Sequence, residues 1–276
     1  MKPTLSLDNL KCSPLLAAPN EPLEKHITDS INEFINRFSP KKEYTLIKLL
    51  RSYDVNIDLI DAKRVFLYSI IFHDIGKAYD WFQNRIIEAI NEQKRDFSVP
   101  RHELFSAYAT LHLLNENAFT NAFQFLRNCI LLTIIWSHSS SRGMVLKRIA
   151  ETIPRYVNVE YVKLSEERIL ELMSMIESIL TKYKCRDGID LLKLPAKISI
   201  NEVKEMLNTL HDMLYSKSIG SNYSLYYATI PVLSTLQLID SLVAYKNRGG
   251  CPQIYITDLP NHLIISKVRE KLWLIE

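Results

Sequence analysis

The chain has 276 residues, of which 47% are hydrophobic and 24% are charged, and its formal net charge is +3. This is an ordinary globular composition, long enough for one large domain or two small ones. The weak positive charge permits a nucleic-acid partner but lacks the strong bias of a dedicated nucleic-acid binder. With only six glycines, a sheet-rich fold with many tight turns is disfavoured and a helical protein is indicated.

The four cysteines are far apart, at Cys12, Cys129, Cys185 and Cys251, and form no Cys-x-x-Cys pair. This spacing excludes a zinc ribbon and indicates free thiols in a reducing cytoplasm. The N-terminus lacks a signal-peptide pattern. The longest apolar run, residues 129–136, is far shorter than the ~20 residues of a membrane span. We therefore expect a cytoplasmic protein without a membrane segment.

Apolar residues recur at helical spacing through the first third of the chain. They predict an amphipathic helix over residues 21–37 and a short helix over residues 43–51. Asp61 is placed to cap a third helix, which runs into the pair His73-Asp74. A fourth helix follows with the apolar residues Trp81, Phe82, Ile86 and Ile87.

The middle of the chain predicts two further helices. Pro100 is placed to open the first of them, because proline is tolerated in the first helical turn. That helix carries His102 and Ser106 on one face. Residues 119–137 are apolar nearly all round, which indicates a central buried helix that ends at His138.

The second half of the chain continues in the same way. Residues 155–164 alternate weakly and predict a loop or a strand. Ser165 starts a helix, Ser199 with Glu202 is a capping-box pattern for another, and Pro231 starts or kinks a last long helix. Residues 254–256 and 263–265 predict a small hairpin or an extended tail. We expect one all-α domain, a helical bundle over residues 1–276, with a possible small C-terminal β-hairpin.

The segment Phe72-His73-Asp74-Ile75-Gly76-Lys77-Ala78 carries the most chemical information. Imidazole and carboxylate both bind divalent transition metals, and a carboxylate can bridge two of them. Gly76 is expected to let the backbone turn and leave the metal face open. Lys77 places a cation where a phosphate would lie. The segment therefore predicts a metallohydrolase that acts on phosphate esters.

Four more residues are candidate ligands, although each has a simpler interpretation. His26 flanks a helix and suits a structural histidine, His102 suits a surface residue in a first turn, and His138 suits a helix C-cap. Asp240 lies on an apolar helical face, where a carboxylate needs a cation or donors, so a buried salt bridge is its simpler interpretation.

The joint pattern is more specific, because these residues fall on five separate predicted helices or helix ends, and a bundle can direct them at one centre. The order His…His-Asp…Asp resembles the HD superfamily of metal-dependent phosphohydrolases. The segments Trp81-Phe82-Gln83 and Arg101-His102-Glu103-Leu104-Phe105-Ser106-Ala107 look like those of the HD nuclease of type I CRISPR systems. This resemblance covers residues 20–145 and 230–245.

The resemblance implies two metal sites that share Asp74. His26, His73, Asp74 and Asp240 would hold one ion, while Asp74, His102 and His138 would hold the second, and Lys77 would contact the scissile phosphate. The family usually has a second histidine directly after the one at His138, where this chain has Ser139. A hydroxyl is a poorer transition-metal ligand than imidazole, so we expect one tight and one weaker site. The segment between His138 and Asp240 is long for the family, which predicts an insertion at about residues 144–225.

The implied cofactors are divalent metal ions: Mn, Mg, Co or Ni. A histidine-rich shell favours transition metals over Mg, which prefers oxygen ligands. The resemblance also implies a nucleic-acid substrate, single-stranded DNA above all, and an RNA-guided complex that exposes it. No Gly-x-x-x-x-Gly-Lys-Ser/Thr motif occurs in the chain, so DNA unwinding would need a separate helicase subunit. Two alternatives stay open: an HD phosphohydrolase acting on nucleotides, and a degenerate HD scaffold without activity.

Overall fold

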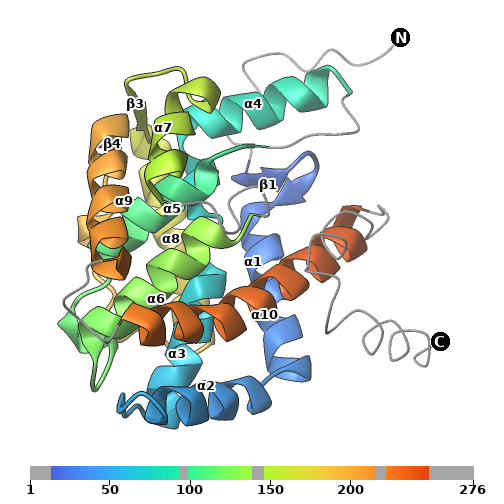
Figure 1. The fold of residues 1–276 in the computed structure, drawn as a ribbon. Coiled ribbons are helices and arrows are strands. Elements are labelled where there is room, and N and C mark those ends of the chain that lie inside the picture. Colours follow the sequence, from blue (N-terminus) through green and yellow to red (C-terminus); the bar gives the residue numbers. More distant parts are fainter. Residues whose placement is uncertain (1–13, 94–98, 139–145, 216–221, 249–276) are drawn as a thin grey trace, which may run out of the picture.

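The structure is a computed structural model that describes residues 14–93, 99–138, 146–215 and 222–248. Within these ranges the chain is a helical bundle (Figure 1), as the composition and periodicity predict. Its α-helices are α1 (Leu23–Arg37), α2 (Lys41–Arg51), α3 (Leu59–Phe72), α4 (Asp80–Asn91), α5 (His102–Leu113), α6 (Phe123–Trp136), α7 (Leu146–Tyr156), α8 (Glu166–Lys182), α9 (Ile200–Tyr215) and α10 (Asn222–Arg248).

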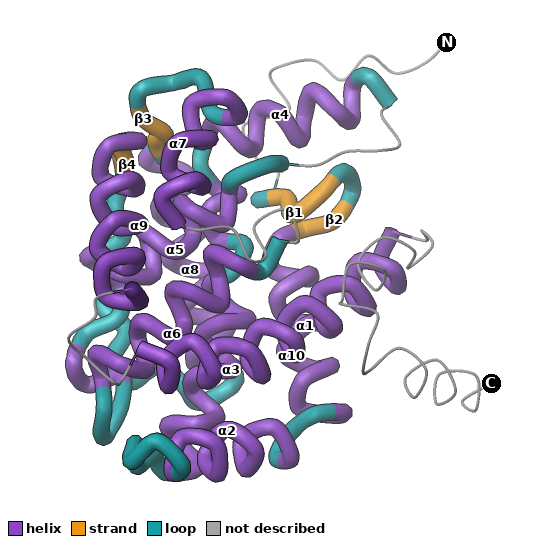
Figure 2. Tube along the Cα trace, in the orientation of Figure 1, coloured by secondary structure: helices purple, strands orange, loops and turns teal. Residues whose placement is uncertain are grey.

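Short 3-10 helices and strands complete the described fold. The 3-10 helices are η2 (Ile75–Ala78), η3 (Glu116–Ala118) and η5 (Leu191–Lys193). The strands form two antiparallel pairs, β1 (Leu16–Ala18) with β2 (Glu21–Pro22) and β3 (Tyr161–Lys163) with β4 (Lys197–Ser199), and Figure 2 shows how small they are beside the helices. The strand alternative for residues 155–164 is therefore correct over β3. The expected C-terminal hairpin at 254–265 lies outside the described residues.

Helix α6 is the centre of the bundle, as its all-round apolar sequence predicts. It packs against α3, α5 and α10, and its residues from Asn128 to Trp136 are buried without a break. Helices α1 and α10 pack against each other and against α3. The ends of α3 and α6 and the middle of α10 therefore meet in the interior, at the positions that carry the candidate ligands.

The expected cap of α3 is wrong by one turn. Asp58 is the N-cap, and its side chain accepts a hydrogen bond from the Asp61 backbone N–H at 2.7 Å. Asp61 lies within the first turn and is fully buried, and its carboxylate accepts hydrogen bonds from the backbone N–H groups of Thr120 and Asn121. Its role is to fix the segment that leads into α6. The sequence pattern did not separate these two aspartates because both precede the same apolar run.

Two expectations about prolines also need correction. Helix α5 begins at His102 rather than at Pro100, because Arg101 at its N-cap has φ 71° in the left-handed region. Pro231 lies inside α10, which begins nine residues earlier at Asn222, so it does not start the helix. The alternative expectation, that Pro231 kinks this helix, stays a prediction. The capping box at Ser199 and Glu202 is confirmed: the Glu202 side chain accepts from the Ser199 N–H at 2.7 Å, and the Ser199 hydroxyl accepts from the Glu202 N–H at 3.1 Å.

Helix α10 is long and apolar enough over Tyr223–Arg248 to cross a membrane, judged by length and composition alone. The core helix of a bundle meets the same criterion, and α10 packs against α1, α2, α3, α6 and α9. Residues 146–215 contribute α7 to α9 with β3 and β4, and α7 packs against α9. Their assignment as an insertion stays a prediction.

Candidate metal centre

The structure brings together all six side chains that the sequence singled out as metal ligands. His26 comes from α1, His73 and Asp74 follow the end of α3, His102 opens α5, His138 follows α6, and Asp240 comes from α10. They form two clusters that could each hold an ion: His26, His73 and Asp240 in one, and Asp74, His102 and His138 in the other. Within each cluster the candidate donor atoms lie within 4.8 Å of one another.

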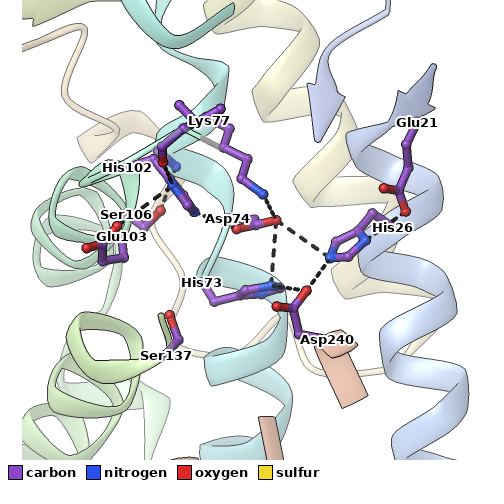
Figure 3. Close-up of polar contacts among 12 residues, drawn as sticks. Glu21, His26, His73, Asp74, Lys77, His102, Glu103, Ser106, Ser137 and Asp240 are labelled. Atoms are coloured by element: carbon purple, nitrogen blue, oxygen red, sulfur yellow. Dashed lines mark hydrogen bonds and ion pairs between the residues drawn. The ribbon is translucent and has the colours of Figure 1, made fainter. Parts of the chain in front are cut away.

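Asp74 faces both clusters with different oxygens. Its Oδ2 lies 3.6 Å from His26 Nε2 and 3.7 Å from His73 Nε2. Its Oδ1 lies 2.9 Å from His102 Nε2 and 3.8 Å from His138 Nε2. Figure 3 shows the carboxylate between His102 on one side and His26 on the other, with His73 and Asp240 below it. This is the placement that a carboxylate bridging two ions requires.

Each histidine presents a nitrogen toward these carboxylates. The Nδ1 atoms of His73 and His102 lie 2.7 Å and 2.5 Å from the backbone oxygens of Ile70 and Val99. An acceptor at Nδ1 fixes the proton there and leaves the lone pair on Nε2. The Nε2 atoms of His26, His73 and His138 are buried and have no hydrogen-bond partner. Unpartnered buried nitrogens that converge on carboxylates fit divalent metal ions as the missing partners.

His26 differs from the other histidines because a carboxylate holds its Nδ1. Glu21 Oε1 lies 2.9 Å from His26 Nδ1, and the Glu21 side chain is almost fully buried. Arg248 Nε lies 2.5 Å from Glu21 Oε2, and the Asn247 amide donates to Glu21 Oε1 at 2.9 Å. The end of α10 therefore fixes a carboxylate that orients a histidine of α1.

Sequence reasoning missed Glu21. It precedes α1 and follows no helical spacing with His26, and its other partners lie more than 220 residues away. No pattern within a single sequence marks such a residue, because the contact depends on how the two ends of the described chain meet.

The carboxylates are held in their anionic form. Burial raises the pKa of both Asp74 and Asp240, but neighbouring cations and imidazoles outweigh it. Lys77 and the neighbouring His73 imidazole hold the pKa of Asp74 well below its usual range, and the nearby imidazoles of His26 and His73 do the same for Asp240. The centre therefore offers two anionic oxygen donors.

The surroundings raise the pKa of two imidazoles of the centre and lower that of a third. Burial lowers the pKa of His26, but Asp240 and Glu21 outweigh it and raise the pKa to about 9. Burial also lowers the pKa of His138, and Asp74 with Glu103 raises it above the ordinary value. For His102, burial and the nearby Lys77 lower the pKa. The raised pKa values of His26 and His138 reflect the acidic side chains around them, an environment that also favours divalent cations.

Lys77 lies beside the shared carboxylate. Its Nζ is 2.6 Å from Asp74 Oδ2, and the side chain is only 8% exposed. Figure 3 shows the ammonium group on the side of Asp74 that faces away from His73 and Asp240. The lysine is therefore a fixed cation at the edge of the centre.

Gly76 has a different role from the one expected. Its φ is not in the left-handed region, so a turn does not require glycine. An added Cβ would instead lie 2.2 Å from the His102 carbonyl oxygen and 2.7 Å from the Ser106 backbone nitrogen. The Gly76 N–H donates to Ser106 Oγ at 2.7 Å. Glycine is needed because η2, which follows Asp74, packs directly on the backbone of α5, which carries His102.

The centre is reachable from one side. His26, His73 and Asp74 are fully buried, whereas the side chains of His138 and Asp240 are 23% and 24% exposed. Gln237 supports this side by donating from its amide to the backbone oxygens of Trp136 and Ser137, at 2.9 Å and 3.0 Å. Ser139, where the family has a histidine, lies outside the described residues, so the expected weakness of the second site stays a prediction.

Comparison with known proteins agrees with this geometry. Two CRISPR-associated endonucleases named Cas3-HD are similar in sequence. The protein from Saccharolobus solfataricus is 23% identical over 230 residues, which cover 82% of this chain and 87% of that protein. The protein from Methanocaldococcus jannaschii is 24% identical over 189 residues, which cover 68% of each chain. The chain is Cas3-HD-like. No family model matches it.

The fold of the chain is also similar to that of a Cas3 HD domain protein. The solved structure of the CRISPR-associated Cas3 HD domain protein from M. jannaschii superposes with a TM-score of 0.50 at 22% identity, over 81% of this chain and 98% of that one. The all-α HD-domain fold expected from the sequence is therefore confirmed. The similarity spans most of both chains.

Proposed function

We propose that this chain is a metal-dependent nuclease that hydrolyses phosphodiester bonds of DNA, with single-stranded DNA as its main substrate, in type I CRISPR interference. The observation that carries the proposal is Asp74, whose two oxygens face two clusters of His and Asp ligands. A carboxylate shared in this way is the arrangement of two-metal phosphodiester hydrolysis. The similarity to Cas3-HD endonucleases supports the same activity.

Some residues of the centre would bind the metal ions, and others orient these ligands or contact the substrate. His26, His73 and Asp240 would hold one ion, His102 and His138 the other, and Asp74 both. Bound divalent ions would supply Lewis-acid stabilisation of the phosphate and activation of water at neutral pH. Backbone carbonyls and Glu21 orient the imidazoles, and Lys77 offers a cation to the scissile phosphate. Aspartates held anionic by their neighbours keep the donor set ready for metal.

The proposal includes partners and compartment. A separate helicase subunit and an RNA-guided complex would deliver an unpaired strand, because the chain has no phosphate-binding loop for ATP-driven unwinding. The cytoplasm suits such an assembly. The described cysteines Cys129 and Cys185 are buried and free, as a reducing compartment permits.

A substrate and metal panel tests this function. Labelled single- and double-stranded DNA, single-stranded RNA and free nucleotides would each be incubated with Mn, Co, Ni, Mg or Zn, and with EDTA. We expect cleavage of single-stranded DNA that requires metal, with transition metals more effective than Mg because the shell is rich in histidine. Hydrolysis of nucleotides without strand cleavage would favour the HD nucleotide phosphohydrolase instead. Absence of both activities in a metal-loaded protein would favour an inactive scaffold.

A further inference from the structure

A pocket of about 400 Å³ lies between α4 and α7, apart from the two ligand clusters. Figure 1 shows these helices near each other at the top of the bundle. Trp81, Asn84 and Arg85 of α4 line one part of the pocket, and Arg155, Tyr156 and Asn158 line the other. The size is within the range of small-ligand sites, and the lining combines flat aromatic rings, guanidinium groups and amides.

The aromatic rings of this pocket are accessible. The Tyr156 side chain is 44% exposed, and Trp81 is half-buried. The Arg85 guanidinium lies 4.6 Å from the centroid of the Trp81 ring, and the Arg101 guanidinium lies 5.0 Å from that of Tyr156. Rings with adjacent guanidinium groups are the surfaces on which unpaired bases stack.

The cations of the pocket have no acidic partner of their own. Among the residues that the structure describes, Arg85 and Arg155 form no ion pair, whereas Arg64, Arg168 and Arg186 each bind a carboxylate. Glu88 is the single acidic side chain among the lining residues, so the lining has a net positive charge. Two exposed guanidinium groups without carboxylates suit phosphate, which they can bind with two hydrogen bonds each.

Two sets of contacts connect residues of the pocket with His102 of the metal centre. The rings of Trp81 and Phe82 lie 4.9 Å apart, and Phe82 lies 6.4 Å from the His102 ring. On the other wall, Arg101 precedes His102 in the chain, packs over Tyr156 and donates to Thr152 Oγ1 of α7 at 3.0 Å. The pocket is therefore linked to His102 through the buried Phe82 ring and through Arg101.

We propose that this pocket binds an unpaired nucleotide of the strand that is cleaved. Its base would stack on the rings of Trp81 and Tyr156, its edge would meet the Asn84 and Asn158 amides, and its phosphates would bind Arg85 and Arg155. Such contacts recognise a single strand in general, since every base has a flat face. The inference rests on the proposed nuclease function and gives it a site that selects unpaired strands.

Binding without cleavage tests the pocket. Anisotropy of a labelled single-stranded oligonucleotide, measured in EDTA over a range of salt concentrations, would be compared for wild type, Arg155→Gln and Arg148→Gln. Arg148 is an exposed residue of the same helix that does not line the pocket, so it controls for loss of one charge. We expect Arg155→Gln to weaken binding and to lower the slope of log affinity against log salt by about 1. Arg148→Gln should leave both unchanged.

Stacking has its own test. Trp81→Ala should weaken single-strand binding by about fivefold or more, whereas Trp81→Phe keeps a flat ring and should retain most of it. Double-stranded DNA, whose bases are not free to stack, should bind equally to all variants. Equal single-strand binding by wild type, Arg155→Gln and Trp81→Ala would overturn the proposal, as would equal losses for Arg155→Gln and Arg148→Gln.

The nuclease function is judged separately, by wild-type cleavage in Mn. A wild type that cleaves, with pocket variants that bind and cleave as it does, would refute the pocket alone. A wild type that does not cleave would refute the function on which the pocket rests, whatever the binding data show.

Discussion

Glu21 offers a prediction that only the structure could supply. Glu21→Gln keeps the shape of the side chain and removes its charge. The carboxylate orients His26 Nδ1 at 2.9 Å and is itself fixed by Arg248 and Asn247. Loss of such an outer-shell partner typically costs roughly 10- to 100-fold in metal affinity, or about 1.4 to 2.7 kcal/mol. We expect the upper part of this range, since Glu21 is only 2% exposed and solvent cannot replace it.

The assay is calorimetric titration of Mn²⁺ into metal-free protein, with helical content checked by circular dichroism. Glu33→Gln is the matched control. Glu33 lies on α1 and pairs with Lys246 of α10 and with Arg37, so its loss removes another contact with the end of α10 without touching a histidine. Glu21→Gln should weaken the site that contains His26, while Glu33→Gln should bind as wild type does. Equal affinities for all three proteins, or equal losses for both variants, would refute the reasoning.

Three further predictions concern the centre itself. If Asp240 is a ligand, saturating metal should raise the melting temperature of wild type, because a ligand that binds only the folded state stabilises it. Asp240→Asn should show a much smaller increase in melting temperature. The same increase in both proteins would indicate that Asp240 is a structural carboxylate. Ser139→His should lower the metal concentration for half-maximal cleavage by adding an imidazole beside His138, and no response would indicate that the second site is already complete. Gly76→Ala should lower the free energy of unfolding, measured in urea, by at least the ~1–3 kcal/mol typical of an overpacked core, because the new Cβ would lie 2.2 Å and 2.7 Å from backbone atoms of α5. A variant as stable as wild type would show that η2 and α5 can move apart.

Much of the arrangement of the centre followed from the sequence. The candidate ligands lie at ends of helices or on apolar helical faces, and a bundle leaves few places where such polar groups can meet. The His-Asp pair at the end of an apolar helix predicted the position of the centre. Asp240 lies on an apolar helical face, so its carboxylate was expected to find its partners in the interior. The structure accordingly brings His26, His73, Asp74, His102, His138 and Asp240 together.

What the sequence did not reveal depends on contacts between distant segments. Two aspartates precede α3, and only the position of Thr120 and Asn121 shows that Asp61 serves the next segment rather than its own helix. Gly76 is required by the backbone of α5, which no local pattern records. The contacts of Glu21 with the end of α10, and the pocket between α4 and α7, likewise arise only when the helices pack.

Cleavage by Asp74→Ala tests the central claim most directly. Because Asp74 faces both clusters, its loss should disrupt both metal sites together. Wild type and Asp74→Ala would be compared for Mn-dependent cleavage of labelled single-stranded DNA and for bound metal, with the fold checked by circular dichroism. We predict metal-dependent cleavage by wild type and a loss of several orders of magnitude in a folded Asp74→Ala variant that binds less metal. Cleavage near the wild-type rate by that variant would contradict the two-metal account.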